Sequence, residues 1–257
     1  MKLTSKSIAV TGGSSGLGLE LSRQLVERGN VVVAVGRDPE RLDHARQAIK
    51  GLKTFRADIA DPAQRLELLD FVRKDLPSCD MLINNAGIMR AVDFNDAQER
   101  EALEAEIAIN LEAPIQLTSL FIPVLRAQPA ACIVNVSSGL AYAPFPVAPV
   151  YSATKAAMHS YTQSLRIQLK ASGIGVVEVI PPGLDTPMIT GDMRSAMAGQ
   201  RMASAEQIAA TIIRRIEAGD SEIAPGTSSM LRLMSRVAPG LLMRQMAAMY
   251  KRSPVSR

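Results

Sequence analysis

The sequence has little of what marks secreted, metal-binding or membrane-spanning proteins. Its two cysteines, Cys79 and Cys132, lack metal-ligand spacing and cannot form a disulfide framework, so we expect reduced, structural thiols and no metal site. No window approaches the roughly 20 uninterrupted apolar residues of a membrane span. The N-terminal residues lead into a strand without the long apolar core of a signal peptide. These absences favour a cytoplasmic protein.

Acidic residues are absent from residues 223–257, whose basic residues are Arg232, Arg236, Arg244, Lys251, Arg252 and Arg257. The whole chain has a formal net charge of +4, so residues 1–222 carry a net negative charge. A mildly acidic body argues against a nucleic-acid-binding protein, because such proteins present a basic patch on the folded domain. We therefore expect no nucleic-acid partner.

Strands and helices alternate along the rest of the chain. Hydrophobic residues make up 47% and charged residues 21% of the 257, as in ordinary globular proteins. Apolar patterns predict strands at 7–11, 31–35, 53–57, 80–83, 131–136, 176–180 and 221–224, and helices at 16–28, 62–74, 97–126, 150–170 and 205–217, with another opened by Pro39. This order predicts an α/β fold, a doubly wound and mostly parallel sheet with helices on both faces. We expect one domain, residues 1–226, followed by a C-terminal helical extension, residues 227–257.

A glycine-rich turn follows the first predicted strand, and Gly12, Gly16 and Gly18 give it the spacing T-G-x-x-x-G-x-G. Such a turn between a strand and a helix lets a pyrophosphate approach the backbone and lie at the positive end of the helix. The pattern is weak by itself, but its position between a strand and a helix favours a dinucleotide site.

The second predicted strand ends in Gly36, Arg37 and Asp38. Many NAD sites place a carboxylate here for the ribose diol, whereas an arginine can pair with the 2′-phosphate of NADP. Asp38 is better explained as the N-cap of the helix that Pro39 opens. Arg37 therefore favours NADP(H) over NAD(H), although a solvated surface arginine is the alternative.

Tyr151 and Lys155 lie four residues apart in a predicted helix, so the phenol and the ammonium share one face. A nearby cation favours the phenolate and lowers a tyrosine pKa that is ordinarily about 10. A phenol with such a pKa can exchange a proton with a substrate oxygen near neutral pH. Taken alone, the pair is better explained as a core tyrosine beside a lysine that reaches solvent, and the motifs elsewhere in the chain reverse that preference.

Four motifs occur in one order: Thr11 to Gly18, Asn84-Asn85-Ala86-Gly87, Ser138 thirteen residues before Tyr151, and Tyr151-x-x-x-Lys155. Together they resemble the compact short-chain dehydrogenase/reductase family over roughly residues 3–226. Within it, the sequence is most similar to the DltE-like oxidoreductases of bacteria. The resemblance implies a Rossmann fold and an oxidoreductase that interconverts a carbonyl and an alcohol by hydride transfer with NAD(P).

The resemblance also implies catalytic roles. Tyr151 would be the general acid, and Ser138 would donate a hydrogen bond to the substrate oxygen. Lys155 would bind the nicotinamide ribose and, with the cationic nicotinamide of the oxidised cofactor, lower the pKa of Tyr151. Asn110, in an otherwise apolar helical run, would hold a water that relays protons to Lys155.

Cofactor contacts are implied along the carboxyl ends of the strands: Gly12, Ser14, Ser15, Gly16, Leu17 and Gly18 in the glycine loop, Arg37 after the second strand, Asp58 and Ile59 at the adenine, Asn85, Ala86 and Gly87 at the adenosine ribose, Tyr151 and Lys155 on their helix, and Pro181, Leu184 and Thr186 at the nicotinamide. One position departs from the family, since Pro182 stands where a glycine is expected and Gly183 follows. Proline removes a backbone N–H and fixes φ, so the substrate side of the pocket is expected to be reshaped.

Two segments, 140–150 and 187–203, are expected to wall the substrate pocket. The second contains Met188, Met193, Met197 and Met202, which adapt to varied apolar shapes but could equally fill the core. We expect a small, mostly apolar carbonyl or alcohol substrate.

Residues 228–250 predict two amphipathic helices broken at Pro239-Gly240, with apolar stripes formed by Leu231, Met234, Val237 and Ala238 and by Leu242, Met246 and Met249. Packing on the body, or on a partner subunit in a homodimer or homotetramer, is favoured over contact with an anionic membrane surface. Two rival functions remain, an NAD-dependent alcohol dehydrogenase and a non-catalytic, dinucleotide-binding regulatory protein docked through its basic tail.

Overall fold

The structure is a computed structural model, and it describes residues 1–76, 78–97, 99–189, 191–199 and 202–256. Seven strands form one parallel sheet in the order β3-β2-β1-β4-β5-β6-β7. The strands are β1 (Ser7–Thr11), β2 (Val31–Gly36), β3 (Lys53–Arg56), β4 (Cys79–Asn84), β5 (Ala131–Val136), β6 (Ile174–Val179) and β7 (Glu222–Ile223). The predicted doubly wound parallel sheet is thus confirmed.

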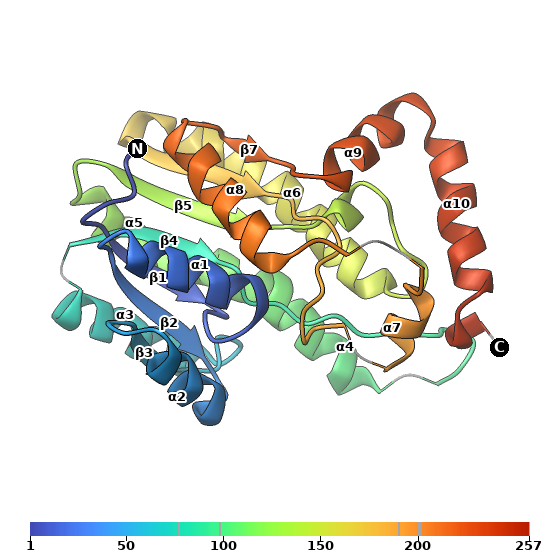
Figure 1. Cartoon of the computed structure of the whole chain (residues 1–257), viewed down its shortest axis with the longest axis horizontal. Coiled ribbons are helices and arrows are strands. Elements are labelled where there is room, and N and C mark those ends of the chain that lie inside the picture. The colour runs from blue at the N-terminus through green and yellow to red at the C-terminus, as the bar shows by residue number, and fades with distance from the viewer. Residues whose placement is uncertain (77, 98, 190, 200–201, 257) are drawn as a thin grey trace.

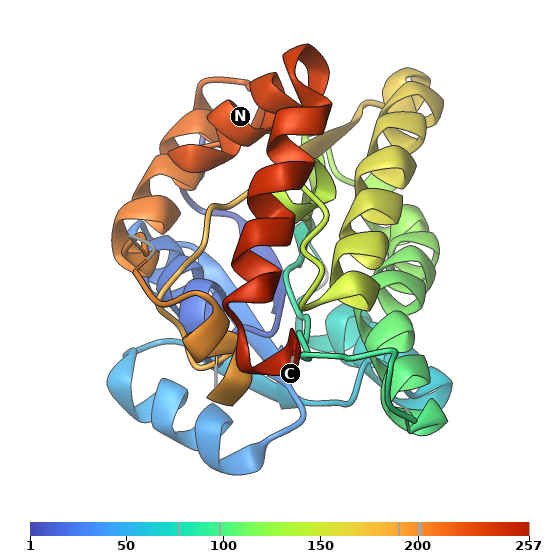
Figure 2. The same ribbon diagram turned by 90° about the vertical axis from the view of Figure 1, so that its right-hand side faces the viewer.

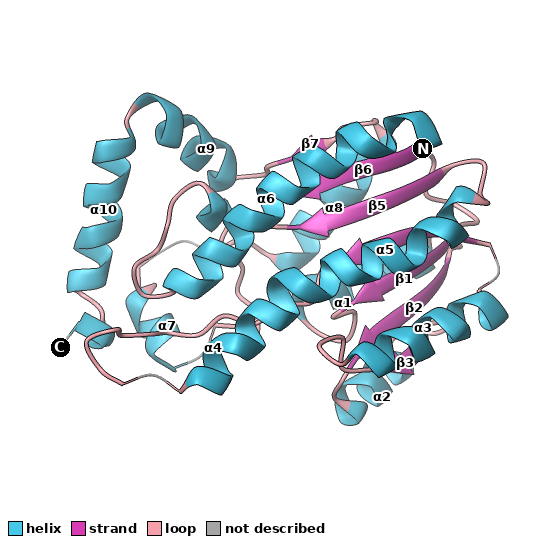
Figure 3. Ribbon diagram, turned by 180° about the vertical axis from the view of Figure 1, so that it is seen from behind, coloured by secondary structure: helices cyan, strands magenta, loops and turns pink. Residues whose placement is uncertain are grey.

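Helices cover both faces of this sheet (Figures 1 and 3). They are α1 (Gly16–Glu27), α2 (Pro39–Ala48), α3 (Pro62–Asp75), α4 (Arg100–Ile107), α5 (Ala113–Arg126), α6 (Pro149–Leu169), α7 (Gly191–Ala196), α8 (Ala205–Glu217), α9 (Thr227–Val237) and α10 (Pro239–Lys251). Side chains of α1, α2 and α8 share one buried core with the sheet. Those of α3, α5 and α6 form a second core on the opposite face.

Local capping starts several of these helices where the sequence places Asp or Ser. The Asp38 side chain accepts from the backbone N–H groups of Glu40 and Arg41, and Pro39 occupies the first turn of α2. This confirms the N-cap predicted for Asp38. Ser204 caps α8 in the same way by accepting from Gln207 N–H.

The strand order reverses between β1 and β4, which pair in parallel with Val10 opposite Ile83. In open parallel sheets, ligands bind beyond the carboxyl ends of the strands at such a switch point. The glycine turn follows β1 and the Asn84–Gly87 run ends β4, so the two predicted motifs lie side by side at this edge.

One long helix passes behind the sheet as α4, a π-helical turn (Ala108–Glu112) and α5. It begins at Arg100 rather than at the predicted Ala97. Residues 100–126 are long and apolar enough to span a membrane by length and composition, since an 18-residue window within them has a mean hydropathy of 1.4. However, Leu117, Phe121 and Leu125 are fully buried against the sheet, so we interpret the segment as a core helix.

The extension, residues 227–257, forms α9 and α10 beyond the carboxyl ends of the strands, beside α7 (Figures 1 and 2). Leu242 and Met246 of α10 are buried, which confirms that the extension packs on the body. Arg232 pairs with Glu222 and ties α9 to β7. The prediction for Val237 was wrong: its side chain is 73% exposed, because it lies on the outer face of the last turn of α9.

Candidate functional site

The glycine loop between β1 and α1 is shaped for close backbone contact. Gly12 has a φ of +65°, and a Cβ there would lie 2.9 Å from the Ala86 Cα. A Cβ on Gly18 would overlap the Gly12 carbonyl oxygen. Ser15 begins α1 without a side-chain cap, and the first turn contains no acidic residue. The backbone N–H groups at this positive helix end therefore face the carboxyl edge of the sheet without a competing anion.

Thr11 and Asn85 fix the loop against the end of β4. The Thr11 hydroxyl oxygen accepts from the backbone N–H groups of Asn85 at 3.0 Å and Ala86 at 3.1 Å. The Asn85 side-chain amide donates to the carbonyl oxygens of Thr11 at 2.9 Å and Gly12 at 3.3 Å. The Asn85 side chain thus holds the glycine loop in place, and its contact with the adenosine ribose stays a prediction.

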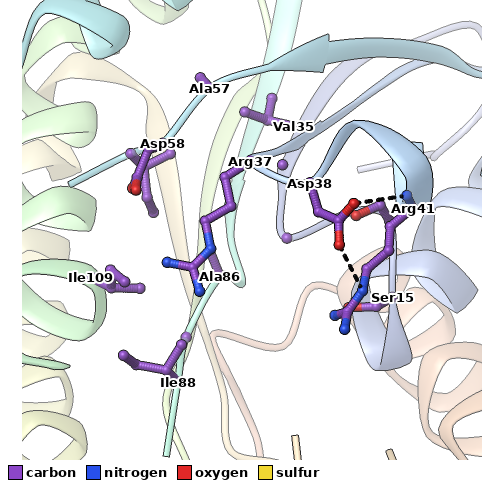
Figure 4. A pocket seen from close by; sticks show the side chains of 15 residues that line it. Ser15, Val35, Arg37, Asp38, Arg41, Ala57, Asp58, Ala86, Ile88 and Ile109 are labelled. Carbon is purple, nitrogen blue, oxygen red and sulfur yellow. Dashed lines mark hydrogen bonds and ion pairs between the residues drawn. The ribbon is translucent and has the colours of Figure 1, made fainter. Parts of the chain in front are cut away.

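A cleft of about 240 Å³ opens beside this loop (Figure 4). Its volume lies below the roughly 300–1,000 Å³ of pockets that enclose a drug-sized ligand, so it suits one half of a dinucleotide. Predicted residues that line it are Gly12, Ser14, Ser15, Arg37, Asp58, Ile59, Ala86 and Gly87. The lining residues that the sequence did not single out for the cofactor are Val35, Gly36, Asp38, Arg41, Ala57, Ile88 and Ile109.

Charge in the cleft is uneven. Asp38 uses one carboxylate oxygen as the N-cap of α2 and the other to pair with Arg41 at 3.2 Å. Arg37 is exposed and reaches across the cleft toward Asp58 and Ile88 in Figure 4, and no ion pair with another described residue is found for it. The Asp38 carboxylate therefore already has partners within the protein, whereas the Arg37 guanidinium is free to contact a ligand in the cleft. The first-turn spacing between Asp38 and Arg41 could have revealed Arg41 from the sequence.

Other predicted cofactor residues lie outside this cleft. Leu17 is buried in the core beneath α1. Pro181 follows β6 and accepts from Gly139 N–H at 3.1 Å, while Leu184 forms a parallel bridge with Ala203. Thr186 approaches the glycine loop from the opposite side, since a Cβ on Gly16 would lie 3.2 Å from its Cβ.

Tyr151, Lys155 and Ser138 meet beyond the carboxyl end of β5. Tyr151 and Lys155 lie in the first two turns of α6 and are 8% and 3% exposed. The Lys155 ammonium donates to the Val136 carbonyl oxygen at 3.0 Å and lies 5.5 Å from the centroid of the Tyr151 ring. Ser138 follows β5 and its side chain interacts with the phenol. The structure thus brings together the three residues that the motifs predicted.

Burial controls the ionisation of this group. The pKa of Tyr151 is raised to about 12, mainly because burial desolvates the phenolate; the Ser138 side chain lowers it and the Glu106 carboxylate contributes a smaller rise. Desolvation also lowers the pKa of Lys155 to about 8. The prediction that the neighbouring ammonium gives Tyr151 a lowered pKa is therefore wrong for the protein by itself, because desolvation of the phenolate is the dominant effect.

Asn110 lies in the π-helical turn and is 1% exposed. Its side-chain oxygen accepts from Ile88 N–H at 2.9 Å, and its amide donates to Ile88 O at 2.8 Å and to the Thr154 hydroxyl at 3.3 Å. One acceptor lone pair remains on that oxygen. The Asn110 side-chain oxygen and the Lys155 ammonium both lie beside Gly87. A Cβ on Gly87 would lie 3.1 Å from the Asn110 oxygen and 3.6 Å from Lys155 Nζ.

Glu106 is a buried residue near this group that the sequence reasoning missed. It precedes Asn110 by four residues on α4 and is 0% exposed. The same helical spacing that turns Asn110 inward also turns Glu106 inward, so the signal was present in the sequence.

Apolar side chains enclose Tyr151 on its other side. They come from the segment before α6, from the described part of residues 187–203, which leaves out 190, 200 and 201, and from α10. The buried members are Ala143, Phe145, Val147, Ala148, Ile189, Met193, Leu242 and Met246. Met188, Met197 and Met202 pack against this cluster. Both predicted wall segments thus meet at Tyr151, and the extension adds a third that the sequence did not reveal.

This geometry agrees with comparisons to known proteins. Residues 6–196 match the short chain dehydrogenase family. The chain belongs to that family. It is 38% identical over 247 residues to the uncharacterized oxidoreductase DltE of Bacillus subtilis (strain 168), covering 96% of this chain and 98% of the relative. We therefore describe it as a short-chain dehydrogenase/reductase, an oxidoreductase of a family that typically uses NAD(P)(H).

Two solved structures extend the likeness. A short chain dehydrogenase from Burkholderia cenocepacia J2315 in complex with NADP superposes with a TM-score of 0.82 at 25% identity, over 96% of this chain and 99% of that one. A 3-ketoacyl-(acyl-carrier-protein) reductase from Brucella melitensis complexed with NADH gives 0.76 at 26% identity, over 83% of this chain and 91% of that one. Both cofactors thus occur among similar structures.

Proposed function

We propose that this short-chain dehydrogenase is an NADP(H)-dependent oxidoreductase that interconverts a mostly apolar carbonyl compound and the corresponding alcohol. One observation carries the proposal: the phenol of Tyr151, the ammonium of Lys155 and the hydroxyl of Ser138 converge at the sheet edge that also bears the glycine loop. A protein that only bound a dinucleotide would not need these proton-transfer groups.

The residues present fit a dinucleotide. Side chains at Gly12 and Gly18 would collide with neighbouring atoms, so the backbone before α1 stays bare. The first turn of α1 has no acidic residue, so a pyrophosphate would be held at this helix end. Asp58 and Ile59 would hold the adenine, Lys155 the nicotinamide ribose, and Leu184 with Thr186 the carboxamide. When bound, the nicotinamide supplies or accepts the hydride.

Arg37 and Asp38 support NADP(H) over NAD(H). Asp38 is engaged with the start of α2 and with Arg41, so it competes poorly for a ribose diol. Arg37 reaches into the cleft, where a planar guanidinium would pair with a 2′-phosphate. Titration of NADPH and of NADH, followed by cofactor fluorescence, tests the preference; tighter NADH binding would favour the NAD-dependent alternative.

The raised pKa of Tyr151 suits carbonyl reduction. With a pKa of about 12, the phenol is protonated at neutral pH and can donate to a carbonyl oxygen. Ser138 would donate a second hydrogen bond to the same oxygen as negative charge develops. The Lys155 ammonium lies over the ring and would stabilise the phenolate that remains. Because Lys155 has a pKa of about 8, reduction is expected to decline above that pH.

The substrate side is apolar and rich in methionine. Met188, Met193, Met197 and Met202 surround Tyr151 together with Leu242 of α10. A Cβ on Gly183 would lie 3.2 Å from the Met202 sulfur, so the backbone beside Pro182 approaches these methionines closely. Flexible thioether side chains adapt to varied apolar shapes, which supports a mostly apolar substrate.

A panel of aliphatic and aromatic aldehydes and ketones, assayed for NADPH oxidation, tests the function. The wild type should turn over at least one compound. Tyr151→Phe should bind NADPH as before but turn that compound over about 10² to 10⁴ times more slowly. Turnover that survives unchanged in Tyr151→Phe would overturn the mechanism. NADPH binding without turnover of any carbonyl or alcohol would instead favour a regulatory protein.

Assembly and location remain predictions. A homodimer or homotetramer is the expected state, and light scattering on the full chain tests it. The alternative of membrane contact through the extension is tested by sedimentation with anionic liposomes. Cys79 and Cys132 are free and buried, and burial raises the pKa of each thiol to about 12, which suits unreactive thiols in a cytosolic protein.

A further inference from the structure

Glu106 is the least satisfied buried carboxyl group in the described part of the chain. It is 0% exposed, and neither side-chain oxygen makes a well-formed hydrogen bond among the described residues, although the backbone N–H of Arg90 is close enough to favour the ionised carboxylate. A buried carboxylate without partners is costly, so such a group normally persists for a reason other than packing. Glu178 shows the contrast, because it is equally buried but accepts from Ser137 Oγ at 2.6 Å and contacts His159 Nδ1 at 2.8 Å.

The groups that face Glu106 come from two elements. Arg90, in the connection after β4, and Lys155, on α6, favour its ionised form. Glu106 in turn acts on α6, where its charge raises the pKa of both Tyr151 and Lys155. Helices α4 and α6 pack against each other, which accounts for this proximity. Glu106 is therefore coupled to the two residues on which the proposed proton transfer depends.

We propose that Glu106 is a positioning residue of this active site, whose buried carboxylate keeps the Lys155 ammonium and the Tyr151 phenol protonated. The inference rests on the proposed function, since it assigns Glu106 a role in the same proton transfer. An anion beside a buried lysine favours the ammonium, and an anion near a tyrosine disfavours the phenolate, so both effects act in the direction of the acid form.

The carboxylate itself titrates near the working range. Burial raises the pKa of Glu106 to about 7, against the opposing influence of Arg90 and Lys155. Above this pH the group is an anion and supports the ammonium of Lys155. Replacing it by glutamine removes that charge at every pH. The pKa of Lys155 should then fall below its value of about 8, and the pKa of Tyr151 should fall with it.

NMR titration tests the inference without turnover. Protein labelled with ¹³C at glutamate carboxyl carbons should show one carboxyl group titrating near pH 7, absent from Glu106→Gln. With ¹³C at the lysine ε carbons, the Lys155 signal, assigned by Lys155→Arg, should titrate about 0.5 pH unit or more lower in Glu106→Gln. An unchanged Lys155 midpoint in Glu106→Gln would overturn the proposal.

Glu104→Gln is the matched control, because Glu104 lies two residues away on α4 and its side chain is 59% exposed. It should leave the Lys155 midpoint where it is in the wild type. Glu106→Asp keeps the charge, so its Lys155 titration midpoint should lie close to that of the wild type. A purely structural role would not require this. If Glu106→Gln fails to fold, the wild-type Lys155 signal still decides, because it should show a second inflection at the pH where the Glu106 carboxyl titrates. A single inflection would then overturn the proposal.

The kinetic arm separates the two proposals. Once a substrate is found, the alkaline limb of the rate profile for carbonyl reduction should move to lower pH in Glu106→Gln and stay in place in Glu104→Gln. If no carbonyl is turned over, the proposed function fails while the NMR titrations still report on the coupling. If turnover is found and the limb does not move, the role of Glu106 fails and the function stands.

Discussion

The two ends of this site differ in construction. At the cofactor end, an open cleft is lined by the glycine loop, by the end of β2 with the charged residues that follow it, and by the segments after β3 and β4. At the catalytic end, Tyr151 is closed in by methionines and by α10, and its neighbours Lys155 and Glu106 are buried ionisable groups. The shape of the backbone is enough to form the cofactor end, whereas the catalytic end depends on which side chains pack over it.

Packing of the extension should matter most for the catalytic end. Leu242→Ala removes a side chain that is 2% exposed in the cluster around Tyr151, and it should lower the free energy of unfolding by about 3 kcal/mol. Urea unfolding measures this loss. Leu241→Ala is the control, because Leu241 is 59% exposed and adjacent in sequence. Equal losses in the two variants would show that α10 does not pack as described.

Backbone shape should matter most for the cofactor end. Gly18→Ala places a Cβ against the Gly12 carbonyl oxygen, so the loop must move, and NADPH turnover should fall by about 100-fold. Gly240→Ala meets no atom within 4 Å and is expected to leave turnover unchanged. Steady-state kinetics with circular dichroism as a folding check compares them. A Gly18→Ala variant with wild-type kinetics would contradict the proposed cradle.

Arg37 sharpens the comparison within the cofactor end. Arg37→Ala should weaken NADPH binding by about tenfold or more, because a charged hydrogen bond is lost, while NADH binding stays within about twofold. Arg46 lies on α2, nine residues after Arg37 and outside the cleft, so Arg46→Ala should change neither affinity. Fluorescence titrations of each variant with NADPH and with NADH give its affinity for each cofactor relative to the wild type. Equal weakening for both cofactors would remove the argument for NADP(H).

The smallest expected effect concerns stability at the catalytic end. The pKa of Glu106 rises from 4.5 in the unfolded chain to about 7 in the folded one, so its charge disfavours folding increasingly as pH rises through that interval. Glu106→Gln should therefore be more stable than the wild type by about 1–2 kcal/mol at pH 8 and no more stable at pH 4. Unfolding curves at the two pH values measure this, and an unchanged difference between pH 4 and pH 8 would refute it.

The fold and the cofactor end could largely be predicted from the sequence. Strand and helix periodicity gave the alternation, and glycine spacing identified a turn that only a bare backbone can form. Asp38 was identified as a cap because Asp-Pro at a helix start has a local cause. Such features depend on neighbours a few residues away in the chain.

The catalytic end depended on contacts between distant segments. The pKa of Tyr151 could not be read from its spacing to Lys155, because burial by α10 and residues 187–203 decides it. The Asn85 amide holds the glycine loop, which only the pairing of β1 with β4 determines. Glu106 shares a helix face with Asn110, yet its effect requires α4 to pack on α6.

The most direct test of the central claim measures hydride transfer from NADPH to the carbonyl carbon and the dependence of the rate on the Tyr151 proton. With NADPH deuterated at the transferred position and any carbonyl found in the panel, mass spectrometry of the product should show one deuterium on the carbinol carbon. Tyr151→Phe, which keeps the ring but lacks the acidic proton, should bind NADPH and yield product at no more than about one hundredth of the wild-type rate. Deuterated alcohol formed at the wild-type rate by Tyr151→Phe would contradict the account.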